Sequence, residues 1–201
     1  TGGRILRVTA KAIGRSGGSI RGNLTAAGDI IAVAAIRGDG IDAQIDARNG
    51  SVRTVKAIHG DIAGSIQADG PVQTVIAVHG NIDANITSHN ASVRTVRAIH
   101  GDITGDITAN QSVRTVLAIH GSVDGNVTAE NGSVRVVKSV HGGIGGDIHA
   151  AGSVRTVVAV RGDVEGDVIS DSSSISVVKS VRGGIGGSIQ AAGPIRSVAA
   201  I

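Results

Sequence analysis

The sequence predicts an all-β fold, a single-stranded parallel β-helix (β-solenoid) of about nine coils, and three observations carry this prediction. Units of 20 or 21 residues repeat along the chain, apolar and polar residues alternate within each unit, and glycine recurs where the alternation breaks. Because a strand places successive side chains on opposite faces, this alternation is typical of strands. A unit of this size cannot bury its own apolar face, so neighbouring units must stack.

The unit that begins at Ser51, SVRTVKAIHGDIAGSIQADG, shows the pattern. From Ile58 to Ala68 every second residue is apolar or glycine, which predicts one long extended side. The three-residue steps from Val52 to Val55 and from Val55 to Ile58 predict corners that keep these residues inward. We therefore expect three sides to each coil.

The repeat has a second, longer period. Later units begin at residues 71, 92, 112, 133, 153 and 174, and their lengths alternate between 20 and 21. The side chain after the second valine alternates as well: Lys56, Ile76, Arg97, Leu117, Lys138, Val158, Lys179. We infer that a two-coil module of about 41 residues was duplicated. The first unit is less regular and carries the insertion GRSGGS before Ile20.

Equivalent residues of stacked coils lie about 4.8 Å apart and form columns. Two aliphatic columns are expected inside, because β-branched side chains pack well on strands. One column is Ile58, Val78, Ile99, Ile119, Val140, Val160, Val181, and the other is Ile62, Ile82, Ile103, Val123, Ile144, Val164, Ile185. Glycines at 60, 80, 101, 121, 142, 162 and 183 are expected where the wall bends or closes in. Left-handed hexapeptide solenoids show an aliphatic residue every six positions, which is absent here. The handedness rule for parallel crossovers also favours a right-handed coil, so a right-handed coil is expected.

Composition narrows the classes of protein. The chain contains no Phe, Tyr, Trp, Met or Cys, which fits a narrow interior and excludes disulfide and thiolate chemistry. No apolar run is long enough to span a membrane, so membrane insertion is not expected. The repeat is unbroken, which predicts a single elongated domain over residues 1–201. The chain lacks Met and starts and stops inside a repeat, so we expect it to be a segment of a longer repeat protein.

A column of histidines is the first candidate for chemistry: His59, His79, His100, His120, His141, continued by Arg161 and Arg182. Imidazoles on adjacent coils could share a metal ion. No third type of ligand recurs with them, and arginine replaces histidine without breaking the repeat. We therefore favour a solvated strand face and predict no metal and no cofactor.

An arginine column is the second candidate: Arg53, Gln73, Arg94, Arg114, Arg135, Arg155, Ser176, Arg196. It could contact an anionic glycan surface, although a solvated corner is the favoured interpretation. The net charge of +3 and the lack of aromatic residues for base stacking argue against nucleic acid.

Three further activities are not expected. The threonine column Thr54, Thr74, Thr95, Thr115, Thr156 lacks the second parallel threonine column that an ice-binding face needs. The stretch GGIGGD at 142 resembles a calcium-binding nonapeptide but does not recur in tandem every nine residues. No cluster of acid, base and nucleophile interrupts the repeat, and the irregular stretch 12–22 holds no carboxylate, so we predict no catalysis.

The run GDIAGSI at 60–66, with GDITGDI at 101 and GGIGGDI at 142, resembles the G-x-I-x-G-x-I coils of bactofilins, which are bacterial polymer-forming cytoskeletal proteins. It is also similar in style to the β-solenoid shafts of large bacterial surface adhesins. Unlike bactofilins, this chain has no aromatic residue near its ends. Both resemblances imply a structural role, at the cell surface for an adhesin shaft and in the cytoplasm for a bactofilin.

The expected function is that of a structural repeat module, a rigid shaft or spacer of a large secreted or cell-surface, adhesin-like protein without catalysis. Its expected partners are neighbouring coils of the same or an identical chain, stacked end to end, and an anionic glycan surface is the alternative that the arginine column leaves open. Two alternatives stay open, a glycan-binding or glycan-cleaving β-helix and a bactofilin-like self-polymerising scaffold.

Overall fold

The computed structural model describes residues 3–5, 7–10 and 18–201, and every element in that part of the chain is a β-strand. One parallel sheet contains β1 (Val8–Ala10), β3 (Ile30–Ala35), β5 (Val52–Ala57), β7 (Val72–Ala77), β9 (Val93–Ala98), β11 (Val113–Ala118), β13 (Val134–Ser139), β15 (Val154–Ala159), β17 (Ile175–Ser180) and β19 (Ile195–Ala200). The other contains β2 (Ile20–Ala26), β4 (Gly40–Ala47), β6 (Asp61–Ala68), β8 (Asn85–Ser88), β10 (Ile107–Ala109), β12 (Val127–Ala129), β14 (Ile148–Ala150), β16 (Val168–Ser170) and β18 (Ile189–Ala191). Residues 11–17, which hold much of the predicted insertion, lie outside the described residues.

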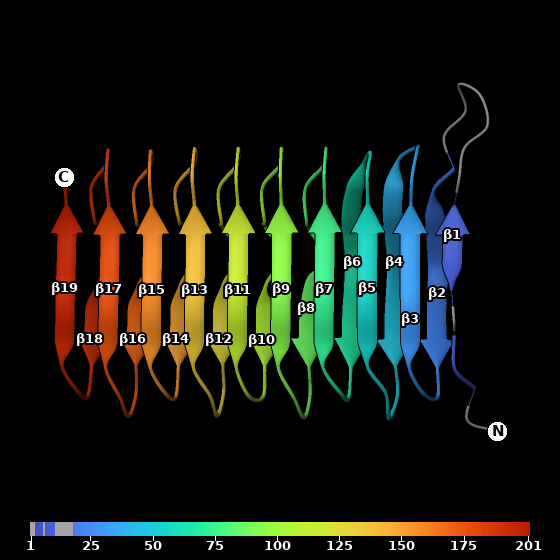
Figure 1. Ribbon diagram of the computed structural model, residues 1–201, viewed down its shortest axis with the longest axis horizontal. Coiled ribbons are helices and arrows are strands. Elements are labelled where there is room, and N and C mark those ends of the chain that lie inside the picture. The colour runs from blue at the N-terminus through green and yellow to red at the C-terminus, as the bar shows by residue number, and fades with distance from the viewer. Residues whose placement is uncertain (1–2, 6, 11–17) are drawn as a thin grey trace.

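Each strand pairs with the equivalent strand of the next coil, so the predicted parallel β-solenoid of about nine coils is confirmed. The odd-numbered strands form a ten-stranded sheet and the even-numbered strands a nine-stranded sheet. In Figure 1 the nearer, odd strands point up, the farther, even strands point down, and the chain advances from right to left. That path is a right-handed coil, as expected. None of the described elements is a helix long and apolar enough to cross a membrane.

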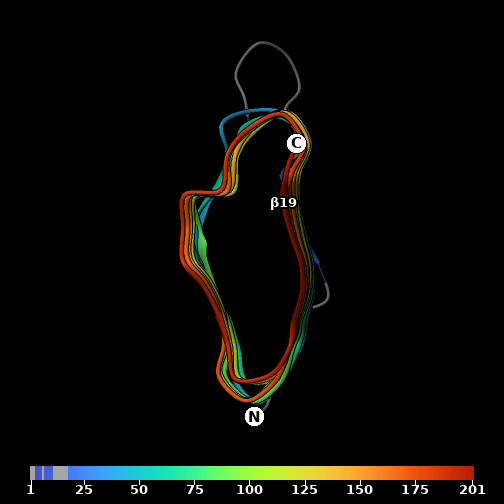
Figure 2. The ribbon, with the colours of Figure 1, turned by 90° about the vertical axis from the view of Figure 1, so that its left-hand side faces the viewer.

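The coil has two walls, and the prediction of three sides is wrong. Seen along the axis, the coils superimpose on one elongated, flattened outline, with the wall that contains β19 on the right (Figure 2). The nearest feature to a third side is a line of single parallel bridges that runs from Ile62 to Ile185 beside the even strands. Beyond these bridges the even wall makes a step in most coils (Figure 2), and β6 is the last strand to cross that region unbroken.

The second predicted interior column is confirmed. The Ile62 column is at most 1% exposed from Ile62 to Val164, and Ile185 in the last coil is partly buried against the same core. The predicted corner between Val52 and Val55 is also present, because both side chains are fully buried while Arg53 between them is exposed.

The first predicted interior column is wrong. Ile58 and its equivalents Val78, Ile99, Ile119, Val140, Val160 and Val181 are only half-buried. The reason is that β5 continues straight to Ala57, so strand alternation turns Ala57 inward and Ile58 outward. The interior column at this position consists of alanine and serine instead. Two of its serines also satisfy corner carbonyls, since the hydroxyl of Ser139 donates to Gly121 O at 2.8 Å.

Glycine lets adjacent coils approach closely at the corner that follows each odd strand. A Cβ atom at Gly121 would overlap the carbonyl oxygen of Gly101 in the preceding coil and lie 2.6 Å from its carbonyl carbon. The same clash recurs along the predicted glycine column, because hydrogen bonds between coils fix the spacing there. The prediction that the wall closes in at these glycines is therefore confirmed.

Candidate functional site

The surface of the solenoid separates charges by wall. From Ser51 onward the chain holds twelve Lys and Arg residues, all on odd strands or in the turn that follows them: Arg53, Lys56, Arg94, Arg97, Arg114, Arg135, Lys138, Arg155, Arg161, Lys179, Arg182, Arg196. It also holds twelve Asp and Glu residues, all on the segments that contain the even strands: Asp61, Asp69, Asp83, Asp102, Asp106, Asp124, Glu130, Asp147, Asp163, Glu165, Asp167, Asp171. One wall is therefore basic and the other acidic.

The histidine column forms a stack of exposed imidazole rings at the corner after the odd strands. The ring centroids of His59, His79, His100, His120 and His141 are 4.7 to 5.0 Å apart, and neighbouring planes differ by 8° to 19°. In two of them Nδ1 lies within hydrogen-bonding distance of a carbonyl oxygen of the preceding coil, His100 of Val78 O at 3.0 Å and His141 of Ile119 O at 2.8 Å. Because a carbonyl can only accept, Nδ1 donates this hydrogen bond, and in the neutral ring Nε2 then has the free lone pair.

This stack is not arranged to chelate a metal ion. The lone pairs of parallel rings run side by side, whereas two ligands of one zinc ion must converge on it at about 2.0 Å each. Among the described residues no group of three or more His, Cys, Asp or Glu side chains could hold a metal ion. The stacked histidine rings instead cover the corner that follows the odd strands.

The arginine column also lies at a corner, where its arginines are exposed. Only Arg53 approaches a carboxylate, Asp29 at 4.0 Å, within the part of the chain that the structure describes. The threonine column faces outward on the odd strands next to the Lys56 column. Among the described residues it is a single column on this wall, so the wall lacks the second, parallel threonine column that an ice-binding face would need.

Most carboxylates and amides of the acidic wall hold the coils together. A side-chain oxygen of one coil accepts the backbone N–H of the equivalent residue in the next coil, as Asp102 Oδ1 does from Ser122 at 2.7 Å and Asn126 Oδ1 from Asp147 at 2.9 Å. Serines do the same in the turn before the odd strands. These contacts give the residues a structural role, because they satisfy backbone donors at bends where the sheet ladder is interrupted.

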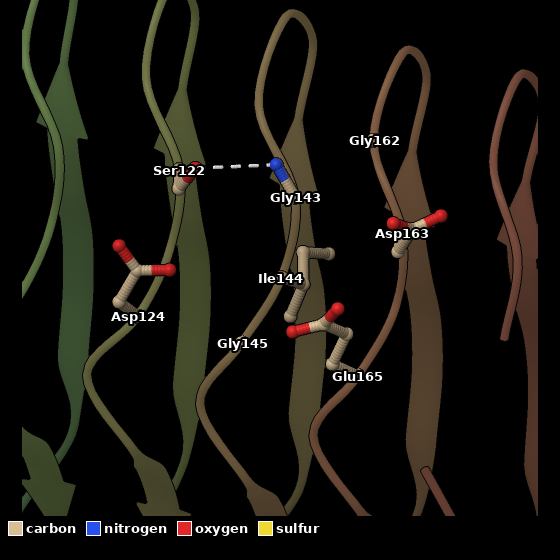
Figure 3. Close-up of a pocket in the computed structure, with 8 residues that line it drawn as sticks. All are labelled: Ser122, Asp124, Gly143, Ile144, Gly145, Gly162, Asp163 and Glu165. Carbon is tan, nitrogen blue, oxygen red and sulfur yellow. Dashed lines mark hydrogen bonds between the residues drawn. The ribbon is translucent and has the colours of Figure 1, made fainter. Parts of the chain in front are cut away.

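A pocket of about 250 Å³ opens on the acidic wall, lined by Ser122, Asp124, Gly143, Ile144, Gly145, Gly162, Asp163 and Glu165. It forms because one coil has glycine at both 143 and 145, where its neighbours have outward side chains. Asp124 on one side and Glu165 on the other flank Gly145 (Figure 3). The pocket is thus a gap between acidic coils, and no residue placed in it by the structure is a nucleophile activated by a base.

Burial raises the pKa of the Asp124 carboxyl above its ordinary value, and the charges of Asp102 and Glu165 raise it further. A raised pKa means that the folded protein binds this proton more tightly than the unfolded chain does. The contribution to stability is therefore present below the ordinary pKa of 3.8 and is lost as the pH rises through the folded-state pKa.

Asp124→Asn is expected to raise the melting temperature at pH 7 by about 1 to 2 °C, because it removes a charge that is ionised there in an unfavourable place. At about pH 3 the carboxyl is protonated in both states, so the difference between the two proteins should vanish. Thermal melts followed by circular dichroism at both pH values measure this. A variant that melts below the parent at pH 7 would contradict the expectation.

Sequence reasoning missed one feature of this wall. Asp42, Asp83, Asp124 and Glu165 occupy the same column on every second coil, and the alternate coils have Ala63, Thr104, Gly145 and Gly186 there. The signal was present in the sequence, since this is the same two-coil period that the Lys56 column shows.

Comparison with protein-family models, with curated proteins and with solved structures finds no match for this chain. The fold and the surface columns are therefore the basis for any functional conclusion.

Proposed function

We propose that this chain is a structural module, a rigid shaft or spacer of a large secreted or cell-surface protein, and that it carries out no catalysis. The observation that carries the proposal is the unbroken ladder of parallel strands from β1 to β19 in one sheet and from β2 to β18 in the other. A structure of this kind keeps a fixed length and resists bending, because each coil is held to both neighbours by backbone hydrogen bonds.

Two features, one of the surface and one of the interior, support a structural role. The outward side chains repeat coil by coil, so most of the described surface consists of columns of equivalent residues. Aliphatic side chains fill the interior, and among the described residues the buried polar ones are four serines. This interior is typical of a structural core.

Distances between spin labels test the rigidity that a shaft requires. The chain has no cysteine, so Ser65→Cys and Ser188→Cys introduce two unique labelling sites in one outward column, six coils apart. Pulsed electron paramagnetic resonance should give one narrow distance distribution centred near about 29 Å, the rise of six coils. A broad distribution in the folded protein would contradict the rod, and the same pair in denaturant supplies the reference for a flexible chain.

The last coil supports a proposal about partners. Ile195 and Val198 of β19 are 41% and 48% exposed, whereas Ile175 and Val178 at the same positions of β17 are fully buried. A further coil placed on β19 would cover these side chains and pair the free edge of the sheet. We propose that this end binds a coil of a second, identical chain.

A further inference from the structure

The two walls carry charges with the same period but in opposite phase. On the basic wall the Lys56 column has a cation on every second coil, at Lys56, Arg97, Lys138 and Lys179, and an aliphatic residue on the coils between. On the acidic wall the column that contains Asp83 has its anions on coils that lack this cation, at Asp42, Asp83, Asp124 and Glu165, and the coils with the cation have Ala63, Thr104, Gly145 and Gly186 there. A coil that has a cation in the Lys56 column of the basic wall therefore has no anion in the Asp83 column of the acidic wall.

None of these charges is neutralised within the described residues. The ion pairs found there involve Arg4, Arg21, Arg48 and Arg53 with nearby aspartates and His149 with Asp171, and none of them uses either column. The Nε atom of Arg97 is buried without a hydrogen-bond partner. Burial raises the pKa of Asp124, and the nearby charges of Asp102 and Glu165 raise it further.

We propose that the basic wall of one molecule binds the acidic wall of a second copy of this chain, with the two solenoids parallel and displaced by one coil. The displacement places each of the four cations of the Lys56 column opposite an anion, because Asp42 continues the Asp83 column in the coil before Ala63. It also places each aliphatic residue, such as Leu117, opposite a small one, such as Thr104 or Gly145. Charge and size therefore fit together in one register.

A second copy fits these columns better than other partners do. A soluble polyanion would account for the basic wall and leave the acidic column, with its matching period, unexplained. A second copy has the same two-coil module and the same rise per coil, so the register is kept along the whole contact. Because the two contacting surfaces differ, each molecule offers a free wall of each sign, and such contacts continue into open stacks. This inference goes beyond the rod proposal and does not rest on the end-to-end contact.

Sedimentation of the folded chain over a hundredfold range of concentration tests the proposal. The parent protein should associate, and its association constant should fall about tenfold or more between about 50 mM and about 500 mM salt, because salt screens exposed ion pairs. Reversal of the basic column, with Lys56→Glu, Arg97→Glu and Lys138→Glu, should weaken association by about tenfold or more. Reversal of the acidic column, with Asp83→Lys, Asp124→Lys and Glu165→Lys, should do the same.

Two controls make the result specific. An equimolar mixture of the two reversed proteins should regain association to within about threefold of the parent, because each then offers walls complementary to the other. Reversal of the same number of charges in the turns, with Asp69→Lys, Glu130→Lys and Asp171→Lys, should change association by no more than about twofold. Circular dichroism verifies that each variant is folded.

Several outcomes would overturn the proposal. A parent protein that stays monomeric at low salt has no such contact, and if it binds dextran sulfate under those conditions the basic wall instead serves a polyanion. Association that is unaffected by both reversals would place the contact at the ends of the rod. Reversed proteins that fail to associate when mixed would show that the columns do not pair.

Discussion

Aspartate in place of Ile103 is expected to lower the free energy of unfolding by about 4 kcal/mol or more. Ile103 is fully buried and forms single bridges with Ile82 and Val123 on either side. The buried polar residues of the described interior are four serines, so a carboxylate at this position would find no cation. The substitution therefore buries an unpaired charge or opens the coil to admit water.

Thermal melts compare Ile103→Asp with Thr115→Asp as the control. Thr115 faces outward on the basic wall, where a carboxylate keeps its water. Thr104 is a poorer control because its hydroxyl donates to Asp83 Oδ1 at 2.6 Å and a second carboxylate would be repelled there. We expect a drop of about 10 °C or more for Ile103→Asp and of less than about 2 °C for Thr115→Asp. Equal losses would contradict the assignment of inner and outer faces.

The coil and most of its interior follow from sequence because identical positions recur in many units. The repeat length, the Ile62 column and the corner at Val52 and Val55 were all correctly predicted, since each is a statement about periodicity. The three-sided cross-section was predicted wrongly. A step within one wall and a corner between two walls interrupt the alternation of apolar and polar residues in similar ways.

The error at Ile58 has a physical origin. Sequence reasoning assumed that the larger side chain points inward, but β5 continues to Ala57, whose side chain is fully buried, so Ile58 turns outward. The evidence was available in the repeat, because position 57 accepts only alanine and serine while position 58 accepts isoleucine and valine. A column that contains only small residues indicates an inward-facing position with little room for a side chain.

The candidate surface was harder to predict than the fold. Each charged column could be identified from the sequence. The net charge of +3, however, does not show that positive and negative charges lie on different walls. That separation depends on which segments share a wall. The orientation of the histidine rings likewise depends on the spacing of adjacent coils, which the sequence predicts only approximately.

Two adjacent glycines, Gly145 and Gly146, differ in which atoms of the preceding coil lie beside them. Gly146→Ala should cost about 3 kcal/mol or more. The added methyl group would overlap the carbonyl oxygen of Gly125 in the preceding coil and lie 2.8 Å from Asp124 O. Both are main-chain atoms, so relief requires the two coils to separate. Separation would stretch the hydrogen bond from Val127 N to Asp147 O, now 2.8 Å long.

Gly145→Ala is the matched control, because a methyl group there would meet only the side chain of Asp124, with Oδ1 at 3.0 Å. That carboxylate can rotate away, and alanine restricts the unfolded chain more than glycine does, so the variant should melt within about 2 °C of the parent. Gly146→Ala should melt lower by about 6 °C or more. Similar melting temperatures for the two variants would show that adjacent coils can separate at little cost, in which case the stacking of these coils could not supply the stiffness that a shaft needs.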